Sequence, residues 1–427
     1  MKTEEAATAL TIEKPLPVKP DKSAIFAAVR DNFLRSHLAA DSTGRGEPTT
    51  KSGINEREEE TISSPPSIIT RAGAPETFSG MPLEVNWAIT KMCNYTCSYC
   101  FGQDKLDRSR FTSLPYLKKA VDHIAELHRD TVRFTFGGGE PTTHPDLGEL
   151  IEYAHRIFGK RLESVLVISN GSRNQKLYET LARNAEIDRV RFNISLHTEF
   201  MELDHIISLV KLLSHKIPLS LNLMFNPLKK EFCRTIHQKL CVLRSAYPFT
   251  LHVIFIRKRP KFARLDDRYV PQDIEWQKQA MEEFEKVAVN GPQIPYPTQR
   301  GYSGAPFWNY ADPSCPYKKM EGTDRDIMFV EGNFNFKGMY CIPGSSLVCI
   351  DPDGTVYGAR ACPQASILYN IFQENPYRHN DFIRPVRCTS PNCGCSTNDQ
   401  LPKFLSSEEA EDFAEMYRFR QAKRMAE

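Results

Sequence analysis

LEVNWAITKMCNYTCSYCFG, residues 83–102, joins a short apolar segment directly to three closely spaced cysteines. The segment Leu83–Thr90 has the length and the β-branched and aromatic content of a buried strand. Cys93, Cys97 and Cys100 follow with the spacing C-x3-C-x2-C. The chain has 12 cysteines, and nine of them fall in two clusters, at 93–100 and 341–395. Clustered thiols in a chain without secretory features indicate metal or redox chemistry.

Apolar segments of the same kind recur along the chain, and helical patterns separate them. Five further strands are predicted at Val132–Phe136, Ser164–Ser169, Val190–Leu196, Leu219–Phe225 and Leu251–Ile256. Helices are predicted at Leu117–His128, Leu147–Phe158, Gln175–Arg183, Leu203–Leu213 and Lys230–Ser245. This alternation predicts parallel β/α units with right-handed crossovers. The predicted fold class is therefore α/β, a partial (β/α)6 barrel over residues 81–257, with functional groups at the C-terminal strand ends.

The flanking segments have different compositions. Residues 1–80 form a polar tail that is predicted to be largely disordered, with one amphipathic helix at Ser23–Ala40. Residues 258–333 form a connecting region with a helix near Trp276–Val289. A small Cys-rich domain is predicted over 334–405, and a terminal helix, Ser407–Ala426, within 406–427.

Composition and charge exclude several classes of partner. The 55 basic and 53 acidic residues nearly balance, which gives no general case for binding nucleic acid or an acidic membrane surface. No apolar run approaches the ~20 residues of a membrane-spanning helix, and the first residues show no secretory pattern. We expect a cytoplasmic protein, and the sequence leaves its oligomeric state open.

The first cysteine cluster has one ligand fewer than an ordinary iron–sulfur site. Three thiolates can hold three irons of a [4Fe–4S] cluster, whereas ferredoxin-type clusters use four cysteines. The remaining iron would stay open to an external donor, as catalytic metal sites do. Structural zinc is the competing interpretation, but it requires four ligands, and no nearby residue completes the set.

With this cysteine loop directly after its first predicted strand, the chain resembles the radical S-adenosylmethionine (SAM) superfamily from about Leu83 to Ile256. The resemblance implies that SAM chelates the open iron of a [4Fe–4S] cluster held by Cys93, Cys97 and Cys100. It also implies reductive cleavage of SAM to methionine and a 5′-deoxyadenosyl radical, which abstracts a substrate hydrogen atom. The electron would come from an external donor such as flavodoxin or ferredoxin.

Further motifs of the family follow in order. In FTFGGGEP, Gly138, Gly139 and Glu140 match the element that contacts the SAM amino group, and a carboxylate complements an ammonium. The resemblance also places Ser169 and Asn170, at the end of the third predicted strand, in the SAM site. It places Ser195 at the ribose or carboxylate of SAM and Tyr99 beside the adenine. Ser169 and Asn170 could instead form a plain strand-to-helix turn.

Polar residues on the fourth and fifth strands alternate with apolar ones. Asn193 and Ser195 alternate with Phe192 and Ile194, so both are expected to point into the barrel. Asn222, Met224 and Asn226 are candidates for the same cavity. His197, at the mouth of the fourth strand, is either an acid or base for the substrate or a structural histidine.

The second cysteine cluster surrounds a predicted hairpin. Asp353-Gly354 lies between two apolar runs, with Cys341 before them and Cys362 after them. This segment resembles the SPASM and twitch domains of radical SAM enzymes. The resemblance implies an auxiliary [4Fe–4S] cluster on Cys341 and Cys362, completed by two of three downstream cysteines, Cys388, Cys393 and Cys395. A zinc site on the same thiols is the alternative, and a second cluster would need Cys349 or Cys315.

The resemblance leaves the substrate open. One hypothesis is a ribosomally made peptide that gains a crosslink or thioether or is epimerised. A second is oxidation or epimerisation of a small molecule such as an amino sugar, and a third is a non-catalytic iron–sulfur or zinc scaffold. An epimerase needs a hydrogen donor on the face opposite the radical, for which Cys315 and Cys349 are the candidates.

Overall fold

The computed structural model describes residues 82–102, 111–183, 190–258, 264–290, 337–359, 362, 367–373, 376–389, 401, 403–404 and 406–426. The predicted polar tail with its helix Ser23–Ala40 lies outside the described residues, as does most of the connecting region. The thiols of Cys315, Cys393 and Cys395 also lie outside them. Within this part of the chain, no helix is both long and apolar enough to cross a membrane.

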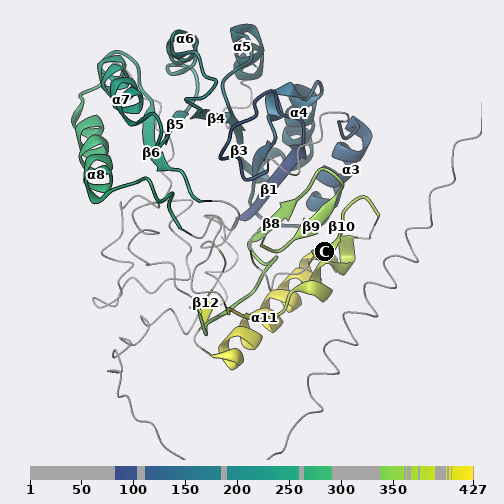
Figure 1. The fold of residues 1–427 in the computed structure, drawn as a ribbon. Coiled ribbons are helices and arrows are strands. Elements are labelled where there is room, and N and C mark those ends of the chain that lie inside the picture. The colour runs from purple at the N-terminus through teal and green to yellow at the C-terminus, as the bar shows by residue number, and fades with distance from the viewer. Residues whose placement is uncertain are drawn as a thin grey trace, which may run out of the picture. The chain divides into compact units, whose positions relative to one another are not determined.

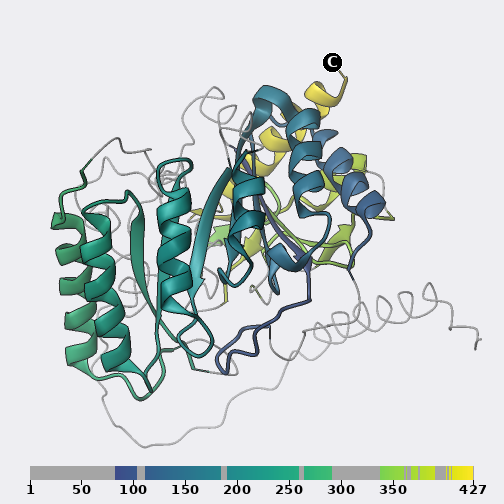
Figure 2. The same cartoon turned by 90° about the horizontal axis from the view of Figure 1, so that it is seen from above.

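Six parallel strands form the centre of the fold in their sequence order. They are β1 (Leu83–Thr90), β2 (Val132–Gly138), β3 (Leu162–Ser169), β4 (Val190–Leu196), β5 (Leu219–Phe225) and β6 (Thr250–Phe255). The helices are α3 (Leu114–Ala125), α4 (Leu147–Phe158), α5 (Gln175–Arg183), α6 (Leu203–Leu213), α7 (Lys230–Arg244) and α8 (Pro271–Lys286). Figure 1 shows these helices as an arc outside the strands, and Figure 2 shows the same arc from above. The predicted α/β fold with six parallel strands is confirmed.

The two faces of this sheet have different environments. Side chains such as Trp87, Phe134, Phe192 and Phe225 are fully buried in one core between the strands and the helices. On β4 the residues that alternate with this core, among them Asn193 and Ser195, are only half-buried. Because successive side chains of a strand point to opposite faces, these residues lie on the concave face, away from the helices.

The predicted hairpin is present and extends the barrel sheet. β8 (Leu347–Ile350) and β9 (Thr355–Tyr357) are antiparallel, and Gly354 between them has a φ of 84°. β8 also pairs in parallel with β1, and β10 (Ile367–Asn370) pairs with β9, so the sheet has the order β10-β9-β8-β1-β2-β3-β4-β5-β6. This pairing was not predicted from the sequence. It satisfies the edge groups that β1 would otherwise expose, as in the hydrogen bond from Glu84 N–H to Ser346 O.

A second, three-stranded sheet carries part of the Cys-rich region. Its order is β11-β7-β12, with β7 (Tyr340–Cys341) between β11 (Val386–Arg387) and β12 (Lys403–Phe404). The terminal helix α11 (Ser407–Ala426) contacts β7 and β12. Arg129, after α3, donates hydrogen bonds to Ser345 O at 2.7 Å and to the Tyr417 hydroxyl at 2.8 Å. This buried arginine therefore ties the barrel to both C-terminal segments.

Candidate functional site

The cysteine loop is fastened to the end of the neighbouring strand β2 by its backbone. The N–H of Gly139 donates to Thr90 O at 2.8 Å, and that of Glu140 donates to Met92 O at 2.7 Å. A Cβ on Gly139 would lie 2.0 Å from Met92 O, and one on Gly138, whose φ is 118°, would lie 2.3 Å from Thr90 O. These two glycines are therefore required by the close approach of the cysteine loop. Their predicted contact with the SAM amino group stays a prediction.

The Glu140 carboxylate lies at the centre of a hydrogen-bond network. It is 1% exposed and accepts hydrogen bonds from Asn170 N–H at 2.6 Å, Ser169 Oγ at 2.8 Å, Thr142 N–H at 3.0 Å and the Thr142 hydroxyl. Burial raises the pKa of Glu140, although these donors oppose the shift. In the structure this carboxylate joins the ends of β2 and β3, and its predicted role toward an ammonium is untested.

Ser169 and Asn170 also take part in holding the site together. The Ser169 hydroxyl is hydrogen-bonded with the Tyr178 hydroxyl at 2.8 Å. The Asn170 amide donates to Asn94 Oδ1 at 2.9 Å, and Asn94 Nδ2 donates to Ser172 Oγ at 2.7 Å. Asn94, Tyr178 and Thr142 were not predicted as site residues, because nothing in their local sequence distinguishes them.

The three thiols of the loop have the chemistry of a cluster site. None of the three forms a disulfide; Cys97 is buried, and Cys93 and Cys100 are half-buried. The Sγ atoms of Cys93 and Cys100 accept backbone N–H groups, from Tyr95 at 3.4 Å and from Gly102 at 3.3 Å. Burial raises the pKa of Cys97 to about 12, with further contributions from Glu199, Cys100 and Cys93. Positive iron would relieve this accumulation of negative charge.

This donor set fits a [4Fe–4S] cluster with one open iron, because one loop supplies three thiolates and amide groups face two of them. Within the described residues, no three His, Cys, Asp or Glu side chains already lie at metal-holding distance.

Two residues that follow β4 contact the cysteine loop. The Tyr99 hydroxyl is hydrogen-bonded with His197 Nδ1 at 3.1 Å, and the two rings stack at 5.8 Å. Burial lowers the pKa of His197 to about 4, so its imidazole is neutral at neutral pH. Glu199 accepts a hydrogen bond from Ser98 N–H at 2.8 Å and a second from the Ser98 hydroxyl. The predicted place of Tyr99 beside an adenine stays a prediction.

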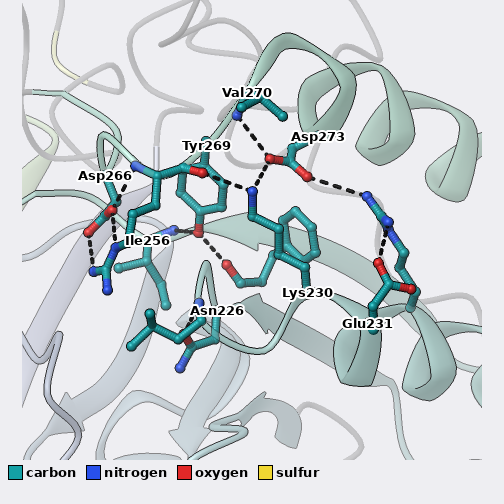
Figure 3. A network of polar contacts seen from close by, with 12 residues as sticks. Asn226, Lys230, Glu231, Ile256, Asp266, Tyr269, Val270 and Asp273 are labelled. Atoms are coloured by element: carbon teal, nitrogen blue, oxygen red, sulfur yellow. Dashed lines mark hydrogen bonds and ion pairs between the residues drawn. The ribbon is translucent and has the colours of Figure 1, made fainter.

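A polar network lies at the opposite edge of the six parallel strands, at β5 and β6 (Figure 3). The Tyr269 hydroxyl donates to Phe225 O on β5 and accepts from Ile256 N–H, just after β6, at 3.0 Å. Lys230 on α7 donates to Asp273 on α8 at 2.5 Å and to Arg268 O at 2.8 Å. The network joins α7 and α8 to the C-terminal strand ends, which fixes that side of the site.

The register of the second sheet brings two of the predicted auxiliary ligands to one face. Cys341 pairs with Val386 across β7 and β11, and the backbones of Met339 and Cys388 are hydrogen-bonded at 2.7 Å. Residues two apart on a strand share a face, so Cys341 and Cys388 are diagonal neighbours. A Cβ on Gly358 would lie 2.4 Å from Pro343, which shows that the segment leading to Cys362 returns toward the second residue after Cys341.

Cys349 has a different environment. It is 1% exposed and packs with Leu347, Ala359 and Leu401, and Cys362 lies against the same cluster. On β8 it pairs with Asn86 of β1, which places it on the concave side of the sheet. Its predicted role as a hydrogen donor is untested.

Comparison with known proteins places this site in a family. Residues 87–210 match the model of the radical SAM superfamily. The chain is 29% identical to the S-adenosylmethionine-dependent nucleotide dehydratase RSAD2 of Oncorhynchus mykiss over 38% of this chain and 43% of that protein. It is 33% identical to a probable GTP 3′,8-cyclase of Pyrococcus horikoshii (31% of this chain, 37% of that protein) and 40% identical to the PqqA peptide cyclase of Bradyrhizobium diazoefficiens (19% and 21%). The chain thus spans less than half the length of each of these relatives.

Solved structures show similarity at low sequence identity. Native anSMEcpe with bound AdoMet and Cp18Cys peptide is 14% identical, with a TM-score of 0.45, over 71% of this chain and 82% of that one. Streptococcus suis SuiB bound to the precursor peptide SuiA is 11% identical, with a TM-score of 0.44, over 83% and 76%.

Proposed function

The chain belongs to the radical SAM superfamily, and on this premise we propose that it reductively cleaves SAM and abstracts a hydrogen atom from a substrate. The observation that carries the proposal is the loop of Cys93, Cys97 and Cys100 at the end of β1, which the glycines of β2 approach closely. When bound there, the cluster and SAM would supply the electron transfer and the 5′-deoxyadenosyl radical. Cys93, Cys97 and Cys100 would be the protein ligands of the cluster.

The residues around the loop would then bind and orient SAM. Tyr99 is the proposed contact to its adenine, and Ser195 the proposed contact to its ribose or carboxylate. The strand ends at Gly138, Gly139 and Asn170 are the proposed contacts to its methionine part. Glu140 would hold the ends of β2 and β3 in place through its four donors. The reductant would be an external flavodoxin or ferredoxin, and the expected setting of the enzyme is the cytoplasm.

We also propose an auxiliary [4Fe–4S] cluster in the C-terminal region. Its support is the shared face of Cys341 and Cys388 and the return of the Cys362 segment toward Cys341. Cys393 or Cys395 would complete the ligand set. Zinc on the same thiols is the competing proposal.

The proposed substrate is a ribosomally made peptide, on which the enzyme would form a crosslink or thioether or invert a stereocentre. The name of one relative, the PqqA peptide cyclase, supports this substrate class. Two other relatives are named for nucleotides, so a small molecule is the second candidate. A short open reading frame for a precursor peptide beside the gene would favour the first, and sugar-biosynthesis genes there would favour the second.

Anaerobic reconstitution tests the proposed chemistry. The full chain with SAM and dithionite should yield 5′-deoxyadenosine, and the variant with Cys93, Cys97 and Cys100 replaced by Ala should yield none. The wild type should hold about eight irons and the variant about four, because each [4Fe–4S] cluster carries four. A reconstituted wild type that produces no 5′-deoxyadenosine would leave the iron–sulfur scaffold as the better description. Zinc in place of iron in the variant would overturn the auxiliary cluster alone.

A further inference from the structure

Three polar side chains form a row across the concave face of the last three barrel strands. Asn193 on β4 pairs in register with Ser220 on β5, and Ser220 pairs with Thr250 on β6. Residues paired in this way point to the same face of the sheet. Their strand neighbours Phe192 and Leu219 are buried in the core on the opposite face. Asn193, Ser220 and Thr250 therefore face the inside of the barrel together.

Each member of this row has a buried oxygen without a hydrogen-bond partner. The atoms are Asn193 Oδ1, Ser220 Oγ and Thr250 Oγ1, and Ser220 is 1% exposed. Folded proteins pair the large majority of their buried polar atoms, since leaving one unpaired costs about 1–3 kcal/mol. Three unpaired oxygens in one register row indicate that a bound group supplies their hydrogen bonds.

The chemistry of the row defines that group. Asn193 Oδ1 only accepts hydrogen bonds, whereas the two hydroxyls both donate and accept. The row contains no charged side chain. On the same face, the Arg133 guanidinium pairs with Glu84 at 2.8 Å and with Glu163 at 2.6 Å, and the charge of Arg191, two residues before Asn193 on β4, acts on Glu84 and lowers its pKa. A charged ligand group would therefore be buried without a counter-ion, which is strongly unfavourable. A neutral hydroxyl or carboxamide can satisfy all three oxygens.

The position of the row relative to Ser195 suggests what binds there. Asn193 precedes Ser195 by two residues on β4, so it lies ~6.6 Å nearer the N-terminal end of the strand. If Ser195 contacts SAM, as the proposed function holds, the row lies one level deeper in the barrel. We propose that Asn193, Ser220 and Thr250 form a substrate subsite that binds a neutral hydroxyl or carboxamide group. This inference rests on the proposed function and specifies the chemistry of its substrate.

Small probes can test the subsite without knowledge of the substrate. Saturation-transfer NMR on the reconstituted full chain with SAM would compare the methyl esters of N-acetyl-asparagine and N-acetyl-serine with the leucine and aspartate equivalents, which lack a hydroxyl or carboxamide, and also with methyl glucoside. We expect asparagine or serine to bind at least about fivefold more tightly than leucine or aspartate, the effect of one hydrogen bond. Ser220→Ala and Thr250→Val should each remove this preference. If methyl glucoside binds more tightly than the other probes, and this preference depends on Ser220 and Thr250, the result would also support the subsite. It would then identify a polyol as the class of ligand that supplies the hydroxyl group.

Ser214→Ala provides a matched control. The Ser214 hydroxyl is also buried and unpaired, but it lies at the end of α6, outside the row. Its removal should leave probe binding unchanged, and thermal unfolding would verify that all three variants fold. The subsite would be overturned if all probes bind with equal affinity. It would also be overturned if S214A loses the probe preference as fully as Ser220→Ala and Thr250→Val do. Formation of 5′-deoxyadenosine in the same samples tests the proposed function separately, because SAM cleavage without any probe preference contradicts the subsite alone.

Discussion

The carboxylate of Glu199 accepts both the backbone N–H of Ser98, at 2.8 Å, and the hydroxyl of the same serine. Ser98 lies between Cys97 and Cys100, whereas Glu199 follows β4, so one side chain anchors the cysteine loop to a strand on the far side of β2 and β3. The same carboxylate contributes to the raised pKa of Cys97. Glu199 thus affects both the position of the loop and the charge around it.

We predict that the two functions of Glu199 can be separated. Glu199→Gln keeps an acceptor for Ser98 but removes a negative charge, which should raise the reduction potential of the cluster while iron content stays at the wild-type level. Glu199→Ala removes the anchor, so the Cys97 thiol of the metal-free chain should react faster with iodoacetamide. Redox titration monitored by electron paramagnetic resonance would measure the first effect and alkylation kinetics the second. If the reduction potential of E199Q and the alkylation rate of Cys97 in E199A both equal those of the wild type, Glu199 neither tunes the charge around the loop nor anchors it.

The three consecutive glycines at the end of β2 are predicted to differ in their tolerance of a side chain. Gly139→Ala would place Cβ 2.0 Å from Met92 O, whereas a Cβ at Gly137 meets nothing within 4 Å. G139A should therefore destabilise the chain by at least about 2 kcal/mol, and G137A by less than about 1 kcal/mol. Urea unfolding of the metal-free, reduced chain measures both values. Similar losses in the two variants would show that the loop adapts to the added methyl group.

The sequence predicted well those helices whose apolar side chains repeat regularly along one face. The bounds of α4, α5 and α6 coincide with the predicted ranges, because their apolar faces repeat along the helix. The helix predicted at Trp276–Val289 instead begins at Pro271, where proline occupies the first turn and Asp273 accepts the Val270 N–H at 2.9 Å. That start signal is local and could have been read from the sequence.

Contacts between distant segments could not be predicted in this way. Glu140 was identified from its motif, but its hydrogen bond with Ser169 joins residues 29 positions apart, and the Ser98–Glu199 contact spans 101 positions. The pairing of β8 with β1 depends on which edge of the sheet is free. Such partners depend on the completed fold, since no local period or spacing encodes them.

Arg129 is predicted to hold the C-terminal segments against the barrel. Arg129→Met would remove the hydrogen bonds to Ser345 O and to the Tyr417 hydroxyl and a cation–π contact at 5.4 Å. A hydrogen bond to a charged group contributes about 1.5–3 kcal/mol. Hydrogen exchange should therefore speed up at residues 341–346 and 407–417, with β4 unchanged. Arg161→Met, which removes a 3.3 Å bond to Ala125 O, is the control. Unchanged exchange in both C-terminal segments would argue against this role.

Glu84 should give the barrel a characteristic pH dependence. It lies on β1 inside the sheet, and burial raises its pKa from 4.5 to about 7 although Arg133 opposes the shift. Its folded-state pKa exceeds the unfolded value, so the folded chain binds the proton more tightly between these two pH values. The stability that Glu84 contributes is then fully present below pH 4.5 and is lost as pH rises to about 7.

Glu84→Gln removes this ionisation. The free energy of unfolding of the wild type, relative to E84Q, should fall by up to about 3 kcal/mol across that pH window and then level off, because one pKa unit corresponds to ~1.4 kcal/mol. Glu163→Gln removes the other carboxylate of Arg133 and therefore controls for the loss of an ion pair. Urea unfolding across the window measures both differences. If the wild type loses no stability relative to E84Q as pH rises, Glu84 is ionised throughout and Arg133 outweighs the effect of burial.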